Sequence, residues 1–465
     1  MSNTPERLIE ALGLTDDAII DPKGDFRRAA ACRVVTDTRS LAPGDVFLAL
    51  RGERFDGHDF LETARDRGAV AAIVEAPVEA PVEAGIAQLI VADTRLALGL
   101  LARYHRLHWQ GRLAAITGNS GKTTVRALCE AILSRSGPTH ATRGNLNNDI
   151  GVPLTLLQLD DSCAQAVIEA GANHTGEIAW TTSLARPDVV LINNVTDAHI
   201  GEFGSAGHIA QAKAEILSGL SPDGVAILNR NDRFYPVWAA LASGHEVLDF
   251  GIDVPARVQA VDMVSDEGFY RFTLAIDGEE IGRVALPLMG RHNVMNALGA
   301  AAAAHAMGCA PVHVLAGLNE AEGVARRMIM IEGIRGTTLI DDSYNANPGA
   351  MRASLDTLVQ RPGPRWCFLG AMGELGHYSV QAHEALGHYA RDLDIDQVVT
   401  IGEPARAIST AAGARGRHFD DWAAMIDFAR HSLPSQASVL IKGSLDAGMD
   451  RLVNALRSES SGDDS

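Results

Sequence analysis

The chain has 465 residues, about three times the length of a typical domain, so we expect three domains that each bury a core. With 46% hydrophobic and 21% charged residues, its composition is that of an ordinary globular protein and excludes a fibrous chain. The net charge of -18 disfavours binding to nucleic acid or to an anionic membrane surface. Because neither a signal-peptide pattern nor an apolar run of membrane-spanning length occurs, we expect a cytoplasmic protein. We also expect a monomer.

The cysteines are odd in number and widely separated, and they lack the CxxC spacing of zinc sites. We therefore predict reduced, mostly buried thiols rather than a disulfide framework. The cysteines are Cys32, Cys129, Cys163, Cys309 and Cys367.

Alternating strand-like and helix-like patterns divide the chain into three predicted domains, at residues 1–92, 93–324 and 325–465. The first ends in a stretch rich in Pro and Glu, which predicts a surface loop, and then a strand-like AQLIVAD. The second begins with a helix-like pattern over residues 94–109 and continues with strands and helices in alternation, which predicts a mainly parallel sheet.

Two further patterns complete the fold prediction. Residues 257–288 alternate hydrophobic and polar side chains, with turn signals at Asp266-Glu267-Gly268 and Asp277-Gly278, which predicts antiparallel hairpins added to the second sheet. After an alanine-rich helix at residues 293–307, the third domain contains apolar runs separated by helical stretches, which predicts an open, Rossmann-like sheet. The predicted fold class is therefore α/β in three domains.

The clearest motif is TGNSGKTT, between a short apolar strand at residues 113–117 and a helix-like pattern. Its glycines let backbone N–H groups turn toward an anion, and the helix dipole favours negative charge. In such a loop Lys122 reaches the β and γ phosphates and Thr123 helps to ligate magnesium. The spacing is GxxGKT rather than GxxxxGK, but the coincidence of strand, loop and helix favours an ATP site over a glycine-rich turn. The predicted phosphate contacts are Gly118, Asn119, Ser120, Gly121, Lys122, Thr123 and Thr124.

Two strand ends in the same domain carry side chains suited to magnesium. Glu169 lies near the carboxyl end of the strand-like AQAVIEAGA, and His199 follows the next strand end by a few residues. Ligand sites in open α/β sheets collect at such ends, so both are candidate metal ligands. Each would be unremarkable alone, and their shared position beside the phosphate loop is what favours a site.

Three other features are ordinary in isolation. Lys213 lies within a helix-like pattern, where a lysine is normally solvated. Asn293 stands at the start of a helix-like pattern and could cap that helix. Gly370, Gly373 and Gly376 have GxxGxxG spacing, which favours a tight strand-to-helix turn over a dinucleotide site.

Together the motifs resemble those of the Mur ligase family, over almost the whole chain. The matching stretches are TDTRSLAPGDVFLALRGERFDGHDF from residue 36, TGNSGKTT from 117, GNLNNDIGVPLTLL from 144, EAGANHTGEI from 169, AHIGEFGS from 198, the segment around Lys213, GRHNVMNAL from 290 and DDSYNANP from 341. GKTT and the general layout are shared by all Mur ligases and by folylpolyglutamate synthases. The combination of GNLNNDIGVP with DDSYNANP is distinctive, and it resembles the motifs of the family branch that adds D-alanyl-D-alanine to a UDP-N-acetylmuramoyl-tripeptide.

The resemblance implies an ATP-dependent amide ligase that works through an acyl phosphate and gives the UDP-linked pentapeptide precursor of peptidoglycan. It implies that the first domain binds the uridine nucleotide and that two magnesium ions take part. The implied metal ligands are Thr123, Glu169, His199 and Lys213, the last as a carbamate. The implied catalytic residues are Lys122, Lys213, His199 and Glu169. The implied further nucleotide contacts are Asn293, Arg327 and Asp342. The implied substrate contacts are Thr38, Arg39, Gly57, His58, Asn145, Asn147, Asn345 and Asn347.

The chain departs from the family pattern at two loops of the third domain. Ala371 stands where the family usually has an acidic residue, and Leu445 stands where it usually has an arginine. Three alternatives remain open: the family member that adds the third amino acid, a folylpolyglutamate synthase, and a non-catalytic nucleotide-binding scaffold. The DNPR-type motif expected of the first alternative does not occur in the sequence.

Overall fold

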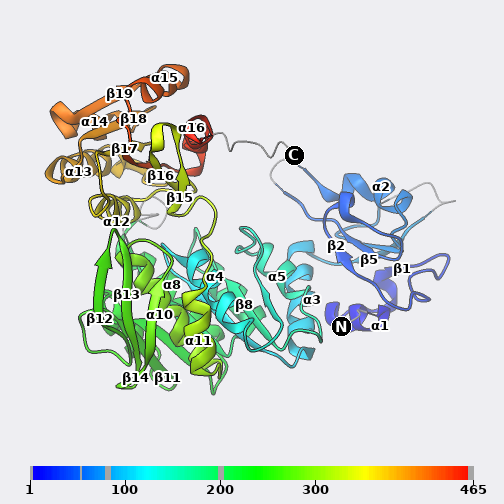
Figure 1. Ribbon diagram of the computed structural model, residues 1–465. Coiled ribbons are helices and arrows are strands. Elements are labelled where there is room, and N and C mark those ends of the chain that lie inside the picture. The colour runs from blue at the N-terminus through cyan, green and yellow to red at the C-terminus, as the bar shows by residue number, and fades with distance from the viewer. Residues whose placement is uncertain (1–3, 53–54, 79–84, 197–203, 459–465) are drawn as a thin grey trace, which may run out of the picture.

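The computed structural model describes residues 4–52, 55–78, 85–196 and 204–458, which form three units built on one sheet each (Figure 1). This three-part α/β architecture confirms the predicted fold class, whereas the exact domain boundaries stay a prediction. All five cysteines are free and four are buried, as predicted. Within the described residues, no helix combines the length and the apolar character needed to cross a membrane.

The first unit is a sheet of five short strands in the order β1-β5-β4-β3-β2, in which only the β1–β5 pair is antiparallel. Strands β3 to β5 consist almost wholly of buried apolar residues, as expected of strands covered on both faces. Leu8 and Leu98 belong to the core on one face, and Leu61 and Ala64 to the core on the other. The elements are α1 (Pro5–Leu12), β1 (Ile19–Ile20), β2 (Val34–Val35), β3 (Val46–Leu48), α2 (Leu61–Asp66), β4 (Ala71–Val74) and β5 (Ala87–Ile90).

The second unit is a sheet in the order β14-β13-β12-β11-β10-β9-β6-β8-β7, parallel from β7 through β12. Successive residues of β6 point to opposite faces: Ile116 belongs to one core and Ala115 to the other. The elements are α3 (Thr94–His108), β6 (Arg112–Thr117), α4 (Lys122–Leu133), β7 (Thr139–Ala141), α5 (Gly151–Leu156), β8 (Gln165–Glu169), α6 (Glu177–Ala185), β9 (Val189–Ile192), α8 (Ala206–Ala214), β10 (Val225–Asn229), α9 (Tyr235–Leu241), β11 (Glu246–Gly251), β12 (Val258–Asp266), β13 (Phe269–Ile276), β14 (Glu279–Leu286), α10 (Arg291–Ala306) and α11 (Pro311–Asn319).

The predicted hairpins are confirmed, because β13 pairs antiparallel with both β12 and β14. Each turn has two consecutive residues with positive φ: Glu267 at 49° and Gly268 at 86°, then Asp277 at 52° and Gly278 at 83°. Two positive φ angles in a row define the turn type whose twist suits a hairpin. The turn signals in the sequence therefore reported the local backbone correctly.

The third unit has strand order β15-β16-β20-β17-β18-β19, with only the β15–β16 pair antiparallel. Met351 and Leu386 belong to the core on one face of this sheet, and Met425 and Leu452 to the core on the other. The elements are β15 (Ile329–Glu332), β16 (Thr338–Asp342), α12 (Pro348–Leu358), β17 (Arg365–Leu369), α13 (Ser379–Asp392), β18 (Gln397–Ile401), α14 (Arg406–Ala412), β19 (Gly416–Phe419), α15 (Trp422–Ser432), β20 (Ser438–Lys442) and α16 (Asp450–Leu456).

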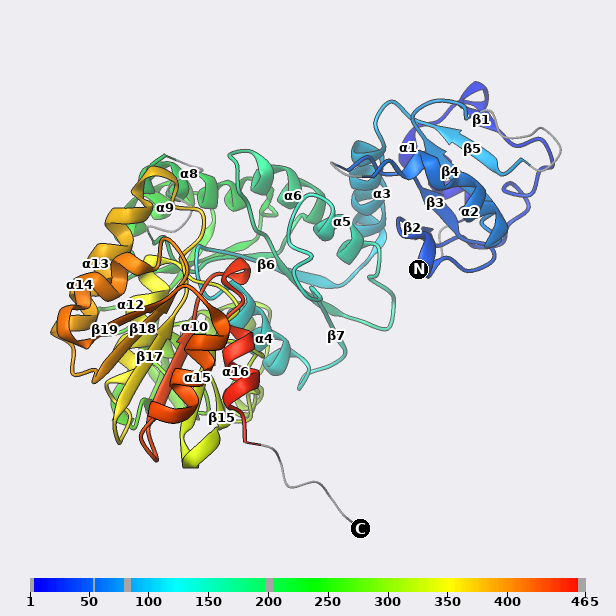
Figure 2. The same cartoon turned by 90° about the horizontal axis from the view of Figure 1, so that it is seen from above.

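The units are joined in different ways. In both views the first unit lies to one side, beyond α3, whereas the third unit sits against the second (Figures 1 and 2). Helix α3 takes part in two cores, since Leu98 packs in the first unit and Ala102 in the second. The turn between β12 and β13 reaches the third unit, where Ser265 Oγ donates to Gln360 Oε1 at 2.7 Å and Glu267 pairs with Arg361 at 3.0 Å.

Candidate active site

The phosphate loop lies where the sequence places it, between β6 and α4. Gly121 precedes the helix with a φ of 80°, and a Cβ there would lie 2.4 Å from the Asn296 amide oxygen. Both the backbone conformation and the close approach therefore require glycine. The loop leads into the N-terminus of α4, whose backbone N–H groups and dipole favour a bound anion.

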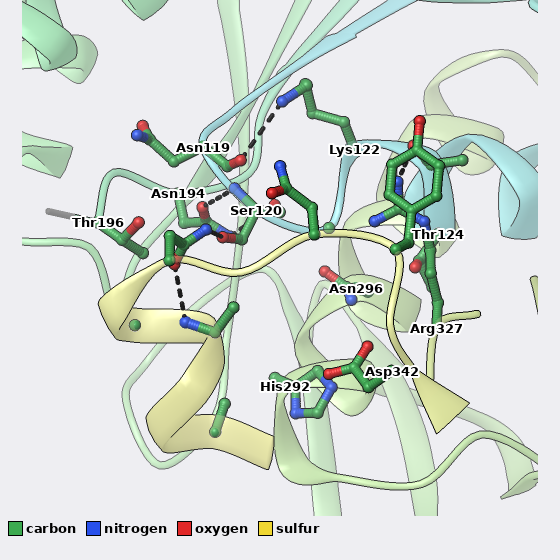
Figure 3. Close-up of a pocket in the computed structure, with 18 of the residues that line it drawn as sticks. Asn119, Ser120, Lys122, Thr124, Asn194, Thr196, His292, Asn296, Arg327 and Asp342 are labelled. Atoms are coloured by element: carbon green, nitrogen blue, oxygen red, sulfur yellow. Dashed lines mark hydrogen bonds between the residues drawn. The ribbon is translucent and has the colours of Figure 1, made fainter. Parts of the chain in front are cut away.

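Two asparagines that directly follow β9 make hydrogen bonds to this loop, and Figure 3 shows Asn194 beside Asn119 and Ser120. Asn194 accepts the N–H of Asn119 through its backbone oxygen at 3.0 Å and the N–H of Ser120 through its side-chain oxygen at 2.9 Å. Asn193 donates to the Ser120 carbonyl at 2.8 Å and to Asn296 on α10 at 2.9 Å. The loop conformation is therefore set by contacts from two other elements of the second unit.

Thr123 and Glu169 meet at the first turn of α4. The Thr123 hydroxyl donates to Glu169 Oε2 at 3.0 Å, and Asn147 donates its amide to Glu169 Oε1 at 2.9 Å. Glu169 is buried at the end of β8. Sequence segments far apart thus bring a hydroxyl and a carboxylate, two oxygen donors that hard cations prefer, to the phosphate loop.

Two side chains of the third unit contact the same loop. Arg327 Nη2 donates to the Thr123 hydroxyl oxygen at 3.0 Å, and Asn347 Nδ2 donates to the Ser120 hydroxyl oxygen at 3.0 Å. The Arg327 guanidinium also lies over the Tyr344 ring, 4.2 Å from its centroid. The phosphate loop is therefore covered by residues that belong to another sheet.

A cavity of about 850 Å³ opens between the second and third units, and its lining residues all come from these two units. The structure brings most of the predicted site residues together in its wall. Those that line it are Asn119, Ser120, Gly121, Lys122, Thr123, Thr124, Asn145, Asn147, Glu169, Asn293, Arg327, Asp342, Asn345 and Asn347. This size suits a nucleotide-sized ligand.

Two lysines beside the loop have altered acidity. Lys122 donates to the carbonyl of Gly118 at 2.8 Å, and burial lowers the pKa of its ammonium group. Lys213 on α8 is 1% exposed. Burial, followed by repulsion from Lys122, lowers the pKa of Lys213 from the usual 10.5 to about 7. The interpretation of Lys213 as a solvated helix lysine is therefore wrong.

Two predicted nucleotide contacts already have partners within the protein. Asp342 accepts from Lys442 Nζ at 2.6 Å and from the Ser354 hydroxyl at 2.7 Å. Asn293 donates to the Met289 carbonyl at 2.7 Å and accepts from Asn296 at 2.9 Å. The proposal that Asn293 caps its helix is wrong, because α10 begins at Arg291 and Gly290 is the capping residue.

The four predicted contacts in the first unit lie away from this cavity. Arg39 pairs with Asp37 at 2.7 Å, next to Thr38, which begins a short helical turn. His58 lies 2.6 Å from Asp56 through Nδ1 and accepts the N–H of Glu75 through Nε2. A Cβ on Gly57 would lie 2.7 Å from the Leu50 nitrogen, so this position too requires glycine. The remaining predicted residue, His199, lies outside the described residues.

Sequence reasoning missed several residues that shape the site. Asn193 and Asn194 form a polar pair directly after an apolar strand, which was the available signal. Asn296 lies one helical turn after Asn293, on the same face of α10. Tyr344 lies within the DDSYNANP motif and Lys442 ends an apolar run, but the sequence indicates neither of their contacts, because their partners are distant in the sequence or belong to another strand.

Three family models match the chain. They are described as "Mur ligase family, catalytic domain" at residues 33–106, "Mur ligase middle domain" at 116–304, and "Mur ligase, glutamate ligase domain" at 326–445. A similar protein is the UDP-N-acetylmuramoyl-tripeptide–D-alanyl-D-alanine ligase of Escherichia coli (strain K12), 43% identical over 91% of this chain and 93% of its own. The third-domain motif and the phosphate loop both fall within the matched families.

Solved structures of Mur ligases are similar to this chain over most of its length. The crystal structure of MurF from Acinetobacter baumannii superimposes with a TM-score of 0.90 at 37% identity, covering 98% of each chain. The MurF ligase of Thermotoga maritima in complex with ADP superimposes with a TM-score of 0.82 at 27% identity, covering 91% of this chain and 96% of its own. Sequence and architecture together establish that the chain belongs to the Mur ligase family.

Proposed function

We propose that this chain is an ATP-dependent ligase that joins D-alanyl-D-alanine to a UDP-N-acetylmuramoyl-tripeptide. The observation that carries the proposal is the pair of hydrogen bonds from Arg327 and Asn347 to the phosphate loop, because they bring the third unit against the loop to which we assign ATP. The similarity to the Escherichia coli ligase supports the same reaction. The other two ligase alternatives have weaker support, since their solved relatives are under 20% identical to this chain and indicate the fold alone. The cytoplasmic location remains part of this proposal.

The side chains around Thr123 fit a magnesium ion. The Thr123 hydroxyl and the Glu169 carboxylate are oxygen donors 3.0 Å apart at the start of α4. With Lys213 as a carbamate and with His199, they would form the ligand set that the family resemblance implies. Carbamylation requires a neutral amine, and the lowered pKa of Lys213 supplies one near neutral pH. Magnesium, when bound, would offset the repulsion between the phosphates and an approaching carboxylate.

The reaction proceeds in two steps. The terminal carboxylate of the tripeptide attacks the γ-phosphorus of ATP, which forms an acyl phosphate and releases ADP. The amine of D-alanyl-D-alanine then attacks the acyl carbon and loses a proton, and inorganic phosphate leaves. Lys122 and Arg327 bring positive charge to the transferring phosphate, where such charge is worth most in the transition state.

The three units divide the substrates among them. We assign the uridine nucleotide to Thr38, Arg39, Gly57 and His58 of the first unit, and ATP to the phosphate loop with Asn293. We assign the tripeptide end of the uridine substrate to Asn145 and Asn147, which line the same cavity as the phosphate loop. We assign Asn345 and Asn347 of the third unit to contacts with the substrate. Orienting these reactants together can lower the barrier by roughly 7–11 kcal/mol.

The test is a panel of acceptors and donors, read out by phosphate release and by the mass of the product. We expect turnover with UDP-N-acetylmuramoyl-tripeptide, ATP and D-alanyl-D-alanine together. Free meso-diaminopimelate, lysine or glutamate should not replace the dipeptide, and a UDP-linked dipeptide should not replace the tripeptide. Nucleotide binding without turnover of any acceptor would overturn the proposal in favour of a scaffold.

A further inference from the structure

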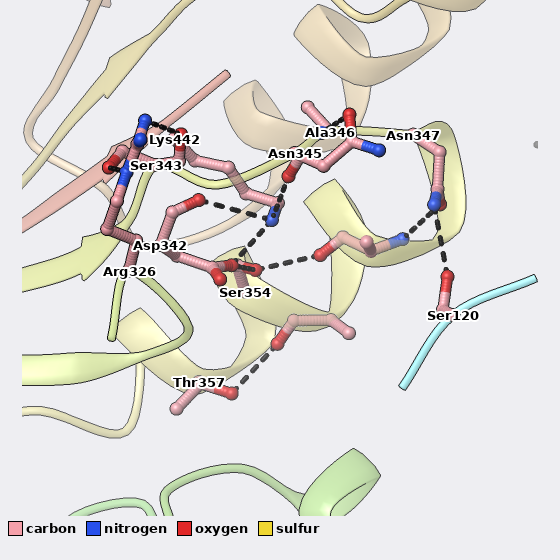
Figure 4. A network of polar contacts seen from close by, with 12 residues as sticks. Ser120, Arg326, Asp342, Ser343, Asn345, Ala346, Asn347, Ser354, Thr357 and Lys442 are labelled. Carbon is pink, nitrogen blue, oxygen red and sulfur yellow. Dashed lines mark hydrogen bonds and ion pairs between the residues drawn. The ribbon is translucent and has the colours of Figure 1, made fainter. Parts of the chain in front are cut away.

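Lys442 is a buried cation that none of the roles assigned above uses. It is the last residue of β20, it is 3% exposed, and its ammonium group donates to Asp342 Oδ2 at 2.6 Å and to the Asn345 carbonyl at 2.9 Å (Figure 4). Strands β16 and β20 are parallel neighbours in which Asp342 and Lys442 are paired residues. The lysine therefore joins the end of β16 to the loop that leaves it.

The same loop continues to the phosphate site. Asn347 caps α12 by accepting the N–H of Ala350 at 2.9 Å, and its amide donates to the Ser120 hydroxyl at 3.0 Å. Ser354 on α12 links back to the start of the loop by donating to Asp342 at 2.7 Å. The segment between β16 and α12 is thus held at its β16 end by Lys442 and Ser354, and at its α12 end Asn347 contacts the second unit.

The chemistry of the contact indicates what it contributes. Replacing both partners of a buried ion pair by apolar residues of similar volume is often neutral or stabilising, whereas removing one partner alone is destabilising, so stability alone does not account for the presence of such a pair. An ammonium group can, however, hold a carboxylate and a carbonyl in one arrangement at the same time. The contribution of Lys442 is therefore geometric, and the geometry it sets is that of Asn345 and Asn347.

We propose that Lys442 is a positioning residue that holds the Asp342–Asn347 segment so that Asn347 meets Ser120 of the phosphate loop. This rests on the proposed function, because the loop matters for turnover only if ATP is used there. Lys442 acts through Asn347 and does not itself touch the reacting groups. Its role differs from a contact to the incoming dipeptide, because its ammonium group is already bound to the loop.

A double-mutant cycle in turnover tests the proposal. Lys442→Met is expected to lower kcat about 100-fold, the usual effect of a misplaced group. The KM for the uridine substrate should change less than twofold, because that substrate is assigned to another unit. If Lys442 works through Asn347, the double variant with Asn347→Ala should be no slower than the slower single variant. Effects that multiply, or a Lys442→Met variant within twofold of wild type, would overturn the proposal.

Arg365→Met is the matched control. Arg365 begins β17, at the opposite end of the same sheet from Lys442, and it pairs with Asp394 at 2.6 Å. Its loss should leave kcat within twofold of wild type. An equal drop in both variants would mean that any lost ion pair in this sheet lowers activity, and positioning by Lys442 would be refuted.

A milder variant keeps the test decisive if Lys442→Met does not fold. Ser354→Ala leaves the ion pair in place and removes the hydroxyl that ties Asp342 to α12. It is expected to lower kcat about tenfold, the equivalent of one hydrogen bond, without multiplying the effect of Asn347→Ala. Multiplication would again refute the proposal. Absence of wild-type turnover with any acceptor, in contrast, would refute the proposed function, so the two failures are distinct.

Discussion

Arg327 Nη2 donates a hydrogen bond of 3.0 Å to the hydroxyl oxygen of Thr123, and this bond joins the start of the third unit to the phosphate loop of the second. The Thr123 hydroxyl donates in turn to Glu169. A permanently charged guanidinium thus lies beside the loop to which ATP is assigned. Any movement between the two units changes the positive charge at that point.

Lys122→Ala should reduce turnover by roughly 10²–10³-fold or more, because it removes positive charge aimed at the transferring phosphate. The measurement is ADP release under saturating substrates. Lys23→Ala is the control, since Lys23 is an exposed lysine of the first unit. Activity of Lys122→Ala near the wild-type level would contradict the assignment of ATP to this loop.

Lys213→Ala should lose most activity and recover part of it when acetate or another short carboxylic acid is added, because the acid can stand in for a carbamate. The titration of activity against acetate concentration measures this. Wild-type enzyme should gain nothing from acetate. A Lys213→Ala variant that is fully active without any acid would show that no carbamate is needed.

The lowered pKa of Lys213 also predicts how stability depends on pH. Between about pH 7 and 10.5 the unfolded chain holds a proton on this lysine that the folded chain has released, so the free energy of unfolding rises with pH. The slope that Lys213 adds to the free energy of unfolding is up to about 1.4 kcal/mol per pH unit in this range. This slope falls to zero below pH 7, where both states hold the proton. Denaturant unfolding of wild type and Lys213→Met at several pH values, in buffer free of carbon dioxide, isolates it. Equal slopes for the two proteins would contradict the lowered pKa.

Because the three substrates are assigned to three units, we expect the units to close toward one another during turnover. Small-angle scattering should show a smaller radius of gyration when the uridine substrate and a non-hydrolysable ATP analogue are both present. Either ligand alone is the control and should have less effect. An unchanged scattering curve with both ligands would mean that the reactants meet without closure.

The fold was predictable where the sequence pattern is local. The β6–loop–α4 unit and the hairpins of β12 to β14 each depend on residues close together in the chain, and both are present as predicted. The turn glycines Gly268 and Gly278 mark positions whose backbone conformation other residues rarely adopt.

The contacts that complete the site were not predictable, because they join residues distant in the sequence. Gly121 owes its second constraint to Asn296 on another helix, and Lys442 meets Asp342 because β16 and β20 are neighbours in the sheet. The family resemblance implied a role for Asp342 but did not indicate that Lys442 and Ser354 donate hydrogen bonds to it. Strand order, which decides these contacts, is not encoded in the spacing of any single motif.

The burial of lysine has a consequence for the chemical reactivity of the protein. The chain has four lysines among its 40 basic residues; Lys213 and Lys442 are buried and Lys122 lines the cavity, whereas Lys23 is exposed. Arginine supplies the other 36 of these 40 residues, and a guanidinium neither loses its proton nor acts as an amine nucleophile at ordinary pH. Among the lysines, an amine-directed reagent applied to the folded protein should therefore modify Lys23, and reach the site only through Lys122, which ATP would protect.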